Sequence, residues 1–223
     1  MAANRKLTAS DGHELGAYHA KPGNSAHAAV VVIQEIFGVN SHIRSLADDF
    51  AAEGFHAIAP QLFDRVEPNV ELGYNPADMQ RGMGMATKIG MENALQDVAA
   101  ALSYARDTLG CAKVGVVGYC FGGSLAWLAA TRLQPAAAVG YYGGRIAQYA
   151  EETPRCPVML HFGARDPHIP ASEIEKIRQR HPELPVFLYD AGHGFNCDQR
   201  KDYEPQSAKL ARERTLEFLR KYL

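Results

Sequence analysis

The chain has 223 residues, of which 47% are hydrophobic and 22% charged, and this composition excludes a disordered, collagen-like or fibrous protein. Its 23 Lys and Arg residues nearly balance its 25 Asp and Glu residues, so the net charge of −2 provides no basic excess to neutralise a nucleic acid or an anionic membrane. We therefore expect a small-molecule partner, no nucleic-acid partner and no membrane partner.

Short apolar runs alternate with segments of helical period along the whole chain. This alternation predicts an α/β protein with a mainly parallel sheet and helices on both of its faces. The predicted strands span residues 28–34, 55–59, 113–118, 136–141, 157–163 and 185–189. The predicted helices lie behind the Asn40-Ser41 cap up to Gly54, around residues 95–109, from 121 to about 132, from 170 to about 180, and over the C-terminal stretch with Leu216, Leu219 and Leu223.

Residues 60–90 form the one long stretch that we predict to be irregular. It contains Gly73, Pro76, Gly82, Gly84 and Gly90, and connections of this length are usually functional lids when they are not disordered. No composition shift, repeat or linker divides the chain. We therefore expect a single domain over residues 1–223, with a lid-like segment at about 60–90.

No segment is typical of membrane insertion or secretion. The longest apolar runs, such as residues 28–33, fall short of the ~20 residues of a transmembrane helix, and the N-terminal stretch MAANRKLTASDG lacks the apolar core of a signal peptide. The four cysteines Cys111, Cys120, Cys156 and Cys197 form no CxxC pair, so they indicate neither a zinc site nor a disulfide-rich scaffold. These features predict a cytoplasmic protein that holds no metal.

A glycine-rich turn around Cys120 is typical of a catalytic nucleophile. The strand 113–118 runs into GYCFGG and then into a helix of small residues, so the thiol stands on a sharp turn at a helix N-terminus, which favours the thiolate. A buried structural cysteine and a dinucleotide-binding turn are the alternatives. The second lacks the G-x-G-x-x-G spacing and an acid about 20 residues on.

A nucleophile needs a base, and the base needs a group that orients it. Asp166 follows one predicted strand and His193 follows the next, so both lie at the same sheet edge as Cys120 and in the chain order of an α/β-hydrolase triad. Each residue alone could be an ordinary turn residue. The nearby competitors are less well placed, and they are His161, His168 and Asp190.

The loop after the first predicted strand carries a second set of candidates. Glu35 follows a buried strand, where an unpaired charge is costly, so it should either reach solvent or meet a partner. The backbone N–H groups of Ile36, in this loop, and of Phe121, directly after the nucleophile, are suited to an oxyanion hole.

Five motifs carry a resemblance to a known family. In chain order they are QEIFGVN, GYCFGG, AVGYYGG, GARDPHIP and AGHGF, and they extend from about residue 28 towards the C-terminus. This set resembles the dienelactone hydrolase (carboxymethylenebutenolidase) family. The resemblance implies a monomeric, cofactor-free α/β-hydrolase that opens a cyclic enol-lactone with a Cys-His-Asp triad.

The resemblance also implies a role for individual residues. Cys120 matches the nucleophile, His193 the general base and Asp166 the acid that orients it. Glu35 matches a glutamate that holds the resting thiol and swings away when substrate binds. Tyr142, in AVGYYGG, is expected to line the pocket, with an ordinary packing role as the alternative.

The chain departs from the family where two arginines hold the substrate carboxylate. Arg81 is the match for the first. Cys197 stands at the place of the second, four residues after His193, and Gly194 replaces the family's serine. We therefore expect a substrate with one anionic group or none, held by Arg81, unless the chain after Gly194 takes a path that lets Arg200 supply the second charge.

Together these features predict a hydrolase that cleaves an ester or lactone through a thioester on Cys120. The alternatives are a non-catalytic binding protein of the same fold and a thiol redox sensor. The complete set of catalytic residues argues against the first, and the lack of a resolving cysteine near Cys120 argues against the second.

Overall fold

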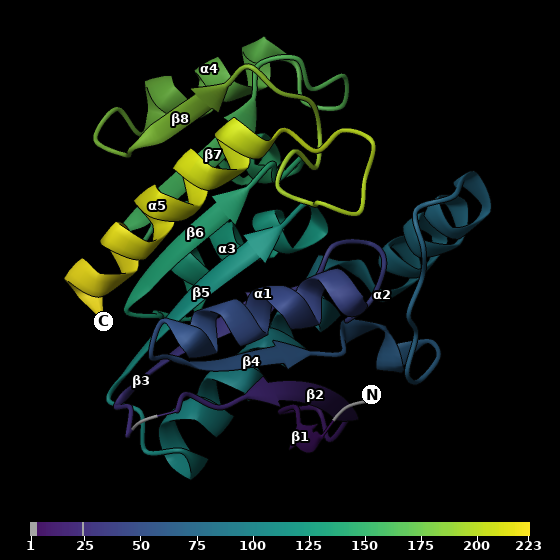
Figure 1. Ribbon diagram of the computed structural model, residues 1–223, viewed down its shortest axis with the longest axis vertical. Helices are drawn as coiled ribbons and strands as arrows, with labels where there is room; N and C mark the ends of the chain where they lie inside the picture. Colours follow the sequence, from purple (N-terminus) through teal and green to yellow (C-terminus); the bar gives the residue numbers. More distant parts are fainter. Residues whose placement is uncertain (1–3, 24) are drawn as a thin grey trace.

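A computed structural model describes residues 4–23 and 25–223 of the chain, and one eight-stranded sheet forms its centre (Figure 1). The strand order is β1-β2-β4-β3-β5-β6-β7-β8, with β1 and β2 antiparallel to their neighbours and the six strands from β4 to β8 mutually parallel. The strands are β1 (Arg5–Thr8), β2 (Glu14–Ala20), β3 (Ala28–Ile33), β4 (His56–Pro60), β5 (Lys113–Tyr119), β6 (Ala137–Tyr141), β7 (Val158–Gly163) and β8 (Val186–Tyr189).

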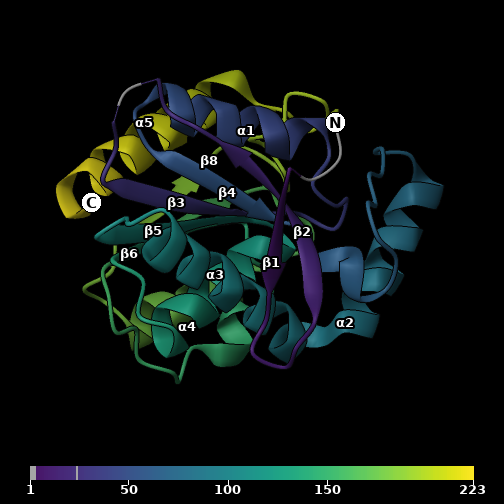
Figure 2. The ribbon, with the colours of Figure 1, turned by 90° about the horizontal axis from the view of Figure 1, so that it is seen from below.

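Helices cover both faces of this sheet, as the sequence predicts (Figure 2). One face carries α1 and α5, and the opposite face carries α2, α3 and α4. The helices are α1 (Ser41–Ala52), α2 (Pro76–Ser103), α3 (Phe121–Arg132), α4 (Ala171–Arg180) and α5 (Pro205–Tyr222), with short turns at η1 (Leu62–Arg65), η2 (Tyr104–Thr108) and η3 (Ile146–Tyr149). Within the described residues, no helix combines the length and the apolar character needed to cross a membrane.

The parallel strands determine where a site can form. All six predicted strands are confirmed, and their ends agree with the prediction to within one residue. Because parallel strands point the same way, the loops after β3, β5, β7 and β8 leave the sheet at one edge. Residues far apart in the sequence therefore meet beside the end of β5.

Two predictions about the elements need correction. The N-terminal strands β1 and β2 were not predicted, because β1 is short and two of the four apolar residues of β2 are alanines, which have low strand propensity. Residues 76–90 are helical rather than irregular. Asn75 caps α2 by accepting a hydrogen bond from the backbone N–H of Asp78, and the helix continues to a break at Gly90, where φ is 71°.

Candidate active site

Cys120 occupies a strained turn between β5 and α3. Its backbone has φ 54° and ψ −112°, a conformation that L-residues rarely adopt outside functional turns. The turn is tight because a Cβ on Gly122 would overlap the carbonyl oxygens of Ile33 and Gln34. The two glycines of GYCFG therefore let β3, β5 and α3 approach closely while the thiol projects from the sheet edge.

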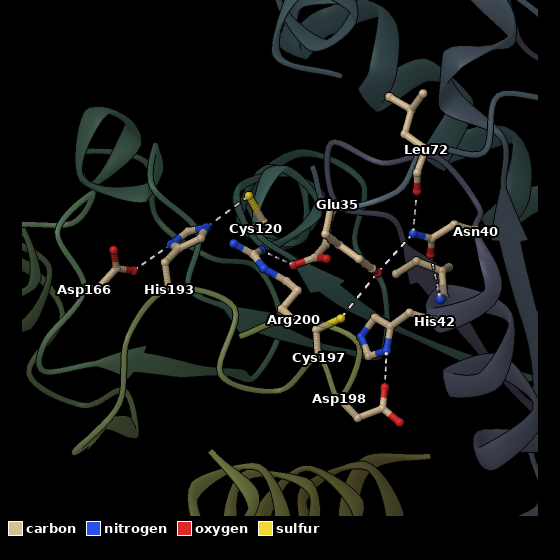
Figure 3. Close-up of polar contacts among 12 residues, drawn as sticks. Glu35, Asn40, His42, Leu72, Cys120, Asp166, His193, Cys197, Asp198 and Arg200 are labelled. Atoms are coloured by element: carbon tan, nitrogen blue, oxygen red, sulfur yellow. Dashed lines mark hydrogen bonds and ion pairs between the residues drawn. The ribbon is translucent and has the colours of Figure 1, made fainter. Parts of the chain in front are cut away.

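Three of the predicted site residues form one hydrogen-bonded series, which we call the Cys120 relay (Cys120, His193 and Asp166; Figure 3). The Nε2 atom of His193 lies 3.2 Å from the Cys120 Sγ, and its Nδ1 lies 2.7 Å from Oδ2 of Asp166. The other carboxylate oxygen of Asp166 accepts the backbone N–H of His168 at 2.8 Å. One nitrogen of the imidazole thus contacts the thiol, and the other contacts a carboxylate that can orient the ring.

The charges of the relay favour a protonated His193. Burial opposes protonation, but the nearby charges of Cys120 and Asp166, with their hydrogen bonds, outweigh it and raise the pKa of His193. The Asp166 carboxylate is fully buried, and the His193 ring is only 12% exposed. Water therefore screens the charge interactions of His193 with its two partners only weakly.

The two predicted oxyanion donors flank the thiol. Phe121 is the first residue of α3, where a backbone N–H has no partner within the helix, and Ile36 and Phe121 line the same pocket as Cys120. Gln34 holds this arrangement: its carbonyl accepts the Gly122 N–H at 3.1 Å, and its side chain accepts the Leu62 N–H at 3.2 Å. Sequence reasoning did not identify Gln34, although a polar residue at the end of a buried strand was the available signal.

Glu35 contacts Arg200 instead of the Cys120 thiol. The Oε1 atom of Glu35 lies 3.4 Å from a guanidinium nitrogen of Arg200, and the two side chains are 1% and 9% exposed. Figure 3 shows the Arg200 guanidinium between the relay and Glu35. In this structure the hydrogen-bond partner of the Cys120 thiol is His193, so the implied contact between thiol and Glu35 is absent from the described residues.

Of the arginines that the sequence offered for the site, Arg200 lines the pocket, which is the alternative that the sequence left open. The chain turns after Gly194 so that Cys197 is buried and its Sγ donates to the Tyr74 hydroxyl at 3.3 Å, while Arg200 lines the pocket. Burial, with the charge of Glu35, raises the pKa of Cys197 to about 11. The thiol at the expected arginine position is therefore a neutral packing group.

The expected place of Arg81 is corrected by the structure. Arg81 lies outside the pocket, half exposed, and its guanidinium pairs with the Glu67 carboxylate at 2.6 Å. The reason is the packing of α2: Gly82 faces the Ile36 carbonyl so closely that a Cβ would overlap it. Its neighbour Arg81 is rotated by about 100° around the helix and so faces away from the site.

Tyr142 packs behind the relay and does not line the pocket. It is fully buried at φ 37°, and its ring centre lies 5.1 Å from that of His193. Its hydroxyl has no hydrogen-bond partner among the described residues, and burial together with Glu35 raises its pKa well above the usual value. The contact with the His193 ring favours the packing role over the pocket-lining role.

The competitors have other partners. His161 is buried, its ring bonds to Tyr189 and Thr215, and burial lowers its pKa to about 3. Asp190 pairs with Arg165 at 3.1 Å. His168 stands beside the relay, with its ring centre 5.3 Å from that of His193.

A pocket of about 390 Å³ opens above the thiol. Met79, Met83 and Ala86 of α2 form an apolar wall, so the segment predicted as a lid contributes one side of the site. The polar residues of the lining include Ser124, Arg145 and Gln148, which no motif indicates, and His168, which the sequence offered as a competitor. A second cavity of about 260 Å³ lies between α1 and α5, but the Cys120 thiol does not reach it.

One group of potential metal ligands occurs among the described residues. Single ligand atoms of His42, Cys197 and Asp198 lie within 4.8 Å of one another. The group contains no residue of the Cys120 relay and lies on the far side of Arg200 from the thiol (Figure 3).

The chain is similar to known proteins over almost its whole length. The model of the dienelactone hydrolase family matches residues 15–223. Carboxymethylenebutenolidase of Pseudomonas putida is 36% identical over 94% of this chain and 92% of its own length, and carboxymethylenebutenolidase 1 of Cupriavidus pinatubonensis is 32% identical over 96% and 94%. The crystal structure of "Putative Dienelactone Hydrolase" from Klebsiella pneumoniae superimposes with a TM-score of 0.84, at 30% identity and 98% coverage of both chains.

Proposed function

The chain belongs to the dienelactone hydrolase family and is a hydrolase of that type, and from this premise we propose that it cleaves an ester or lactone through a thioester on Cys120. The observation that supports this proposal most directly is the Cys120 relay, in which one imidazole contacts both the thiol and a buried carboxylate. A binding protein would have no need for a thiol on a strained turn with a base at 3.2 Å.

In the acylation step, the Cys120 thiolate attacks the carbonyl carbon of the substrate, and the carbonyl electrons move to its oxygen. The N–H groups of Ile36 and Phe121 stabilise the resulting oxyanion. When the tetrahedral intermediate collapses, the bond from carbon to the leaving oxygen breaks and His193 donates its proton to that oxygen. The products of this step are an alcohol or enol and a thioester on Cys120.

In the deacylation step, the neutral His193 accepts a proton from water while the water oxygen attacks the thioester carbonyl. Collapse of the second intermediate expels the Cys120 thiolate, and the carboxylic acid product leaves. Asp166 keeps the imidazole oriented in both steps and stabilises its protonated form, as the 2.7 Å hydrogen bond supports.

Glu35 and Arg200 form an ion pair at the edge of this chemistry. The Glu35 carboxylate compensates the positive charge of the Arg200 guanidinium, which otherwise would lie uncompensated near the thiolate. When an anionic substrate enters, its charge competes with Glu35 for Arg200. We propose that this exchange couples substrate binding to the local charge around Cys120.

The proposal is tested by trapping the thioester. The purified protein is mixed with 4-nitrophenyl acetate, quenched with acid, and digested for mass spectrometry. We expect a rapid burst of 4-nitrophenol and an acetyl group on the peptide that contains Cys120, both lost in Cys120→Ala.

Cys156→Ala is the matched control, because Cys156 is also partly exposed but burial raises its pKa to about 12 and it lies outside the pocket. This variant should keep both the burst and the adduct. Turnover without any adduct on Cys120 would contradict the thioester, and the absence of turnover would favour a binding protein or a redox sensor.

A further inference from the structure

A second group of reactive side chains lies apart from the Cys120 relay, and we call it the His42 cluster (His42, Cys197 and Asp198; Figure 3). His42 is the second residue of α1, whereas Cys197 and Asp198 belong to the loop between β8 and α5. One ligand atom from each residue lies within 4.8 Å of the other two. Because the members come from distant parts of the chain, no local spacing in the sequence indicates the cluster.

His42 lacks the partners that a buried imidazole normally has. Its side chain is 3% exposed, and its Nε2 atom has no hydrogen-bond partner among the described residues. Its Nδ1 atom lies 3.4 Å from Oδ1 of Asp198, which is longer than a charge-assisted hydrogen bond of about 2.7–2.9 Å. Nitrogen and oxygen ligands at about 2.0–2.1 Å from one tetrahedral Zn²⁺ ion lie about 3.3 Å apart. The two side chains therefore have the spacing of ligands that share an ion.

The Cys197 thiol has neighbours that can stabilise a thiolate. Its Sγ lies 3.3 Å from the Tyr74 hydroxyl, which accepts a hydrogen bond from the Asn40 amide at 3.0 Å. A phenol donates as well as accepts, so Tyr74 can reverse its contact and donate to a thiolate while Asn40 still donates to it. The protonated thiol is neutral, and a bound cation displaces its proton. Tyr74 and Asn40 then form the outer shell that orients this ligand.

The thiol needs only a small movement to join the other two ligands. Sulfur at about 2.3 Å from Zn²⁺ lies about 3.6 Å from a nitrogen or oxygen ligand of the same ion. The present separations are no more than 4.8 Å. A rotation of the Cys197 side chain about its Cα–Cβ bond is sufficient to close this difference.

Hydrogen bonds hold the loop of the cluster against α1. The backbone N–H of Arg200 donates to the Cys197 carbonyl at 3.1 Å, which closes a turn around the cluster. The Ser41 hydroxyl, at the first residue of α1, donates to the side-chain oxygen of Gln199 at 2.8 Å. The backbone that carries the three ligands is thus in place before a cation binds, so little ordering opposes binding.

A cavity gives a cation access to the cluster and space for a further ligand. His42 and Asp198 both line the cavity of about 260 Å³ between α1 and α5. The Asp198 side chain is 66% exposed, so the entrance faces solvent. Two basic residues, Lys209 and Arg212, also line this cavity, but each is paired with a glutamate. A water molecule from the cavity can therefore complete a tetrahedral set of ligands.

We propose that the His42 cluster binds one Zn²⁺ ion. Imidazole, thiolate and carboxylate are the ligands of zinc in proteins, whereas Mg²⁺ and Ca²⁺ prefer sites made of oxygen atoms. The bound ion links the loop before α5 to α1 and stabilises the folded protein, because it binds the folded state in preference to the unfolded state. This proposal replaces the expectation of a protein without metal, which rested on the missing CxxC pair, and it does not depend on the proposed hydrolysis.

The test uses Co²⁺ as a probe, because a thiolate ligand gives bound Co²⁺ a charge-transfer absorption band. The purified protein is freed of metal with a chelator, kept reduced with a phosphine, and titrated with Co²⁺ and then with Zn²⁺. We expect one Co²⁺ per chain with a thiolate band, loss of the band when Zn²⁺ displaces Co²⁺, and a rise in Tm with Zn²⁺. Cys197→Ala should abolish the band and weaken Zn²⁺ binding by about 100-fold or more, and Tyr74→Phe should weaken it by about tenfold.

Asp198→Asn provides a second variant that does not depend on the tolerance of a buried position, because this side chain is mostly exposed. It should keep the thiolate band at saturation but weaken Zn²⁺ binding by about tenfold or more, and it should reduce the rise in Tm. Wild-type affinity and an undiminished rise in Tm in this variant would exclude Asp198 as a ligand and overturn the three-residue site.

Cys111→Ala is the matched control, because it removes another buried thiol, outside the cluster. This variant should bind Co²⁺ as the wild type does, and Cys120→Ala should also keep the band. A band that is lost in Cys120→Ala and kept in Cys197→Ala would assign the metal to the relay and overturn the proposal. Binding of Co²⁺ without a thiolate band, or no binding at all, would equally overturn it.

Discussion

At the scale of single residues, His193 determines what the Cys120 thiol can do. The imidazole contacts Sγ at 3.2 Å and the Asp166 carboxylate at 2.7 Å, so it can exchange a proton with the thiol while the carboxylate orients it. We expect Cys120→Ala and His193→Ala each to lower kcat by about 10³-fold or more. Asp166→Asn should lower kcat by a smaller factor. Ester hydrolysis measures kcat, and circular dichroism verifies folding. Near-normal activity in Cys120→Ala would reject the mechanism.

We expect Glu35 to influence the charge beside the thiol through its ion pair with Arg200. In Glu35→Gln the neutral amide no longer compensates the guanidinium, which then favours the Cys120 thiolate. We expect iodoacetamide to alkylate Cys120 severalfold faster in this variant at neutral pH, as measured by mass spectrometry over time.

Glu67→Gln is the control for Glu35→Gln, because it removes a carboxylate from the exposed pair with Arg81, outside the pocket. Alkylation in this variant should follow the wild type. If Glu35→Gln also matches the wild type in rate and pH profile, then Glu35 has no influence on the thiol.

The residues of the site differ in how far sequence could predict them. Cys120, Asp166 and His193 each follow a strand signal, and the order of parallel strands brings such positions to one edge. The pocket arginines have no comparable signal. Arg145 and Arg200 reach the pocket only because of the path of two loops. The orientation of Arg81 depends on the contact of Gly82 with the loop after β3.

At the scale of elements, the close contact of α2 with the loop after β3 positions Ile36. A Cβ on Gly82 would overlap the Ile36 carbonyl oxygen, so Gly82→Ala must displace either the helix or the loop that carries the proposed oxyanion donor. We expect a loss of about 1–3 kcal/mol in the free energy of unfolding and a lower kcat. Urea unfolding and ester hydrolysis measure these two effects.

The same helix supplies a control at Gly84, whose added Cβ would meet no atom within 4 Å. Gly84→Ala should leave kcat unchanged and raise the free energy of unfolding by about 0.5–1 kcal/mol, because alanine has the higher helix propensity. If the two variants behave alike, the contact with Ile36 does not position the loop.

The elements themselves were predictable where one physical signal dominates. Buried parallel strands are continuous apolar runs, so β3 and β5 to β7 were found with their ends. The N-terminal part of α2 was missed because Gly82 and Gly84 weaken its helical pattern, and the pattern does not reveal that Gly82 is required by tertiary packing. Asn75 and Pro76 were the local signals that could have located the helix start.

At the scale of the whole molecule, buried histidines link stability to pH. Burial lowers the pKa of His161 to about 3 and that of His19 to about 4, whereas the unfolded chain binds these protons near pH 6.5. The unfolded state therefore holds more protons between pH 6.5 and 4, and the free energy of unfolding should fall as the pH is lowered through this range. The expected slope is up to about 1.4 kcal/mol per pH unit for each histidine.

Urea unfolding at several pH values between 7 and 4.5 measures this slope. His193 does not contribute to this slope, because its pKa is raised in the folded protein. Its contribution to stability is fully present below the pKa of the unfolded chain and is lost as the pH rises through the pKa of the folded protein. His161→Gln should flatten the curve, whatever its stability at neutral pH. A curve equally steep in the variant would show that His161 does not cause the dependence.

The order of the Cys120 relay along the chain has a consequence for protein synthesis. Cys120 precedes His193 by 73 residues, and Asp166 precedes His193 by 27 residues. Since the ribosome releases the N-terminal part first, the strained turn emerges well before the imidazole that serves it. A nascent chain thus carries a thiol without its proposed base, and we expect products of interrupted translation that end before His193 to lack esterase activity.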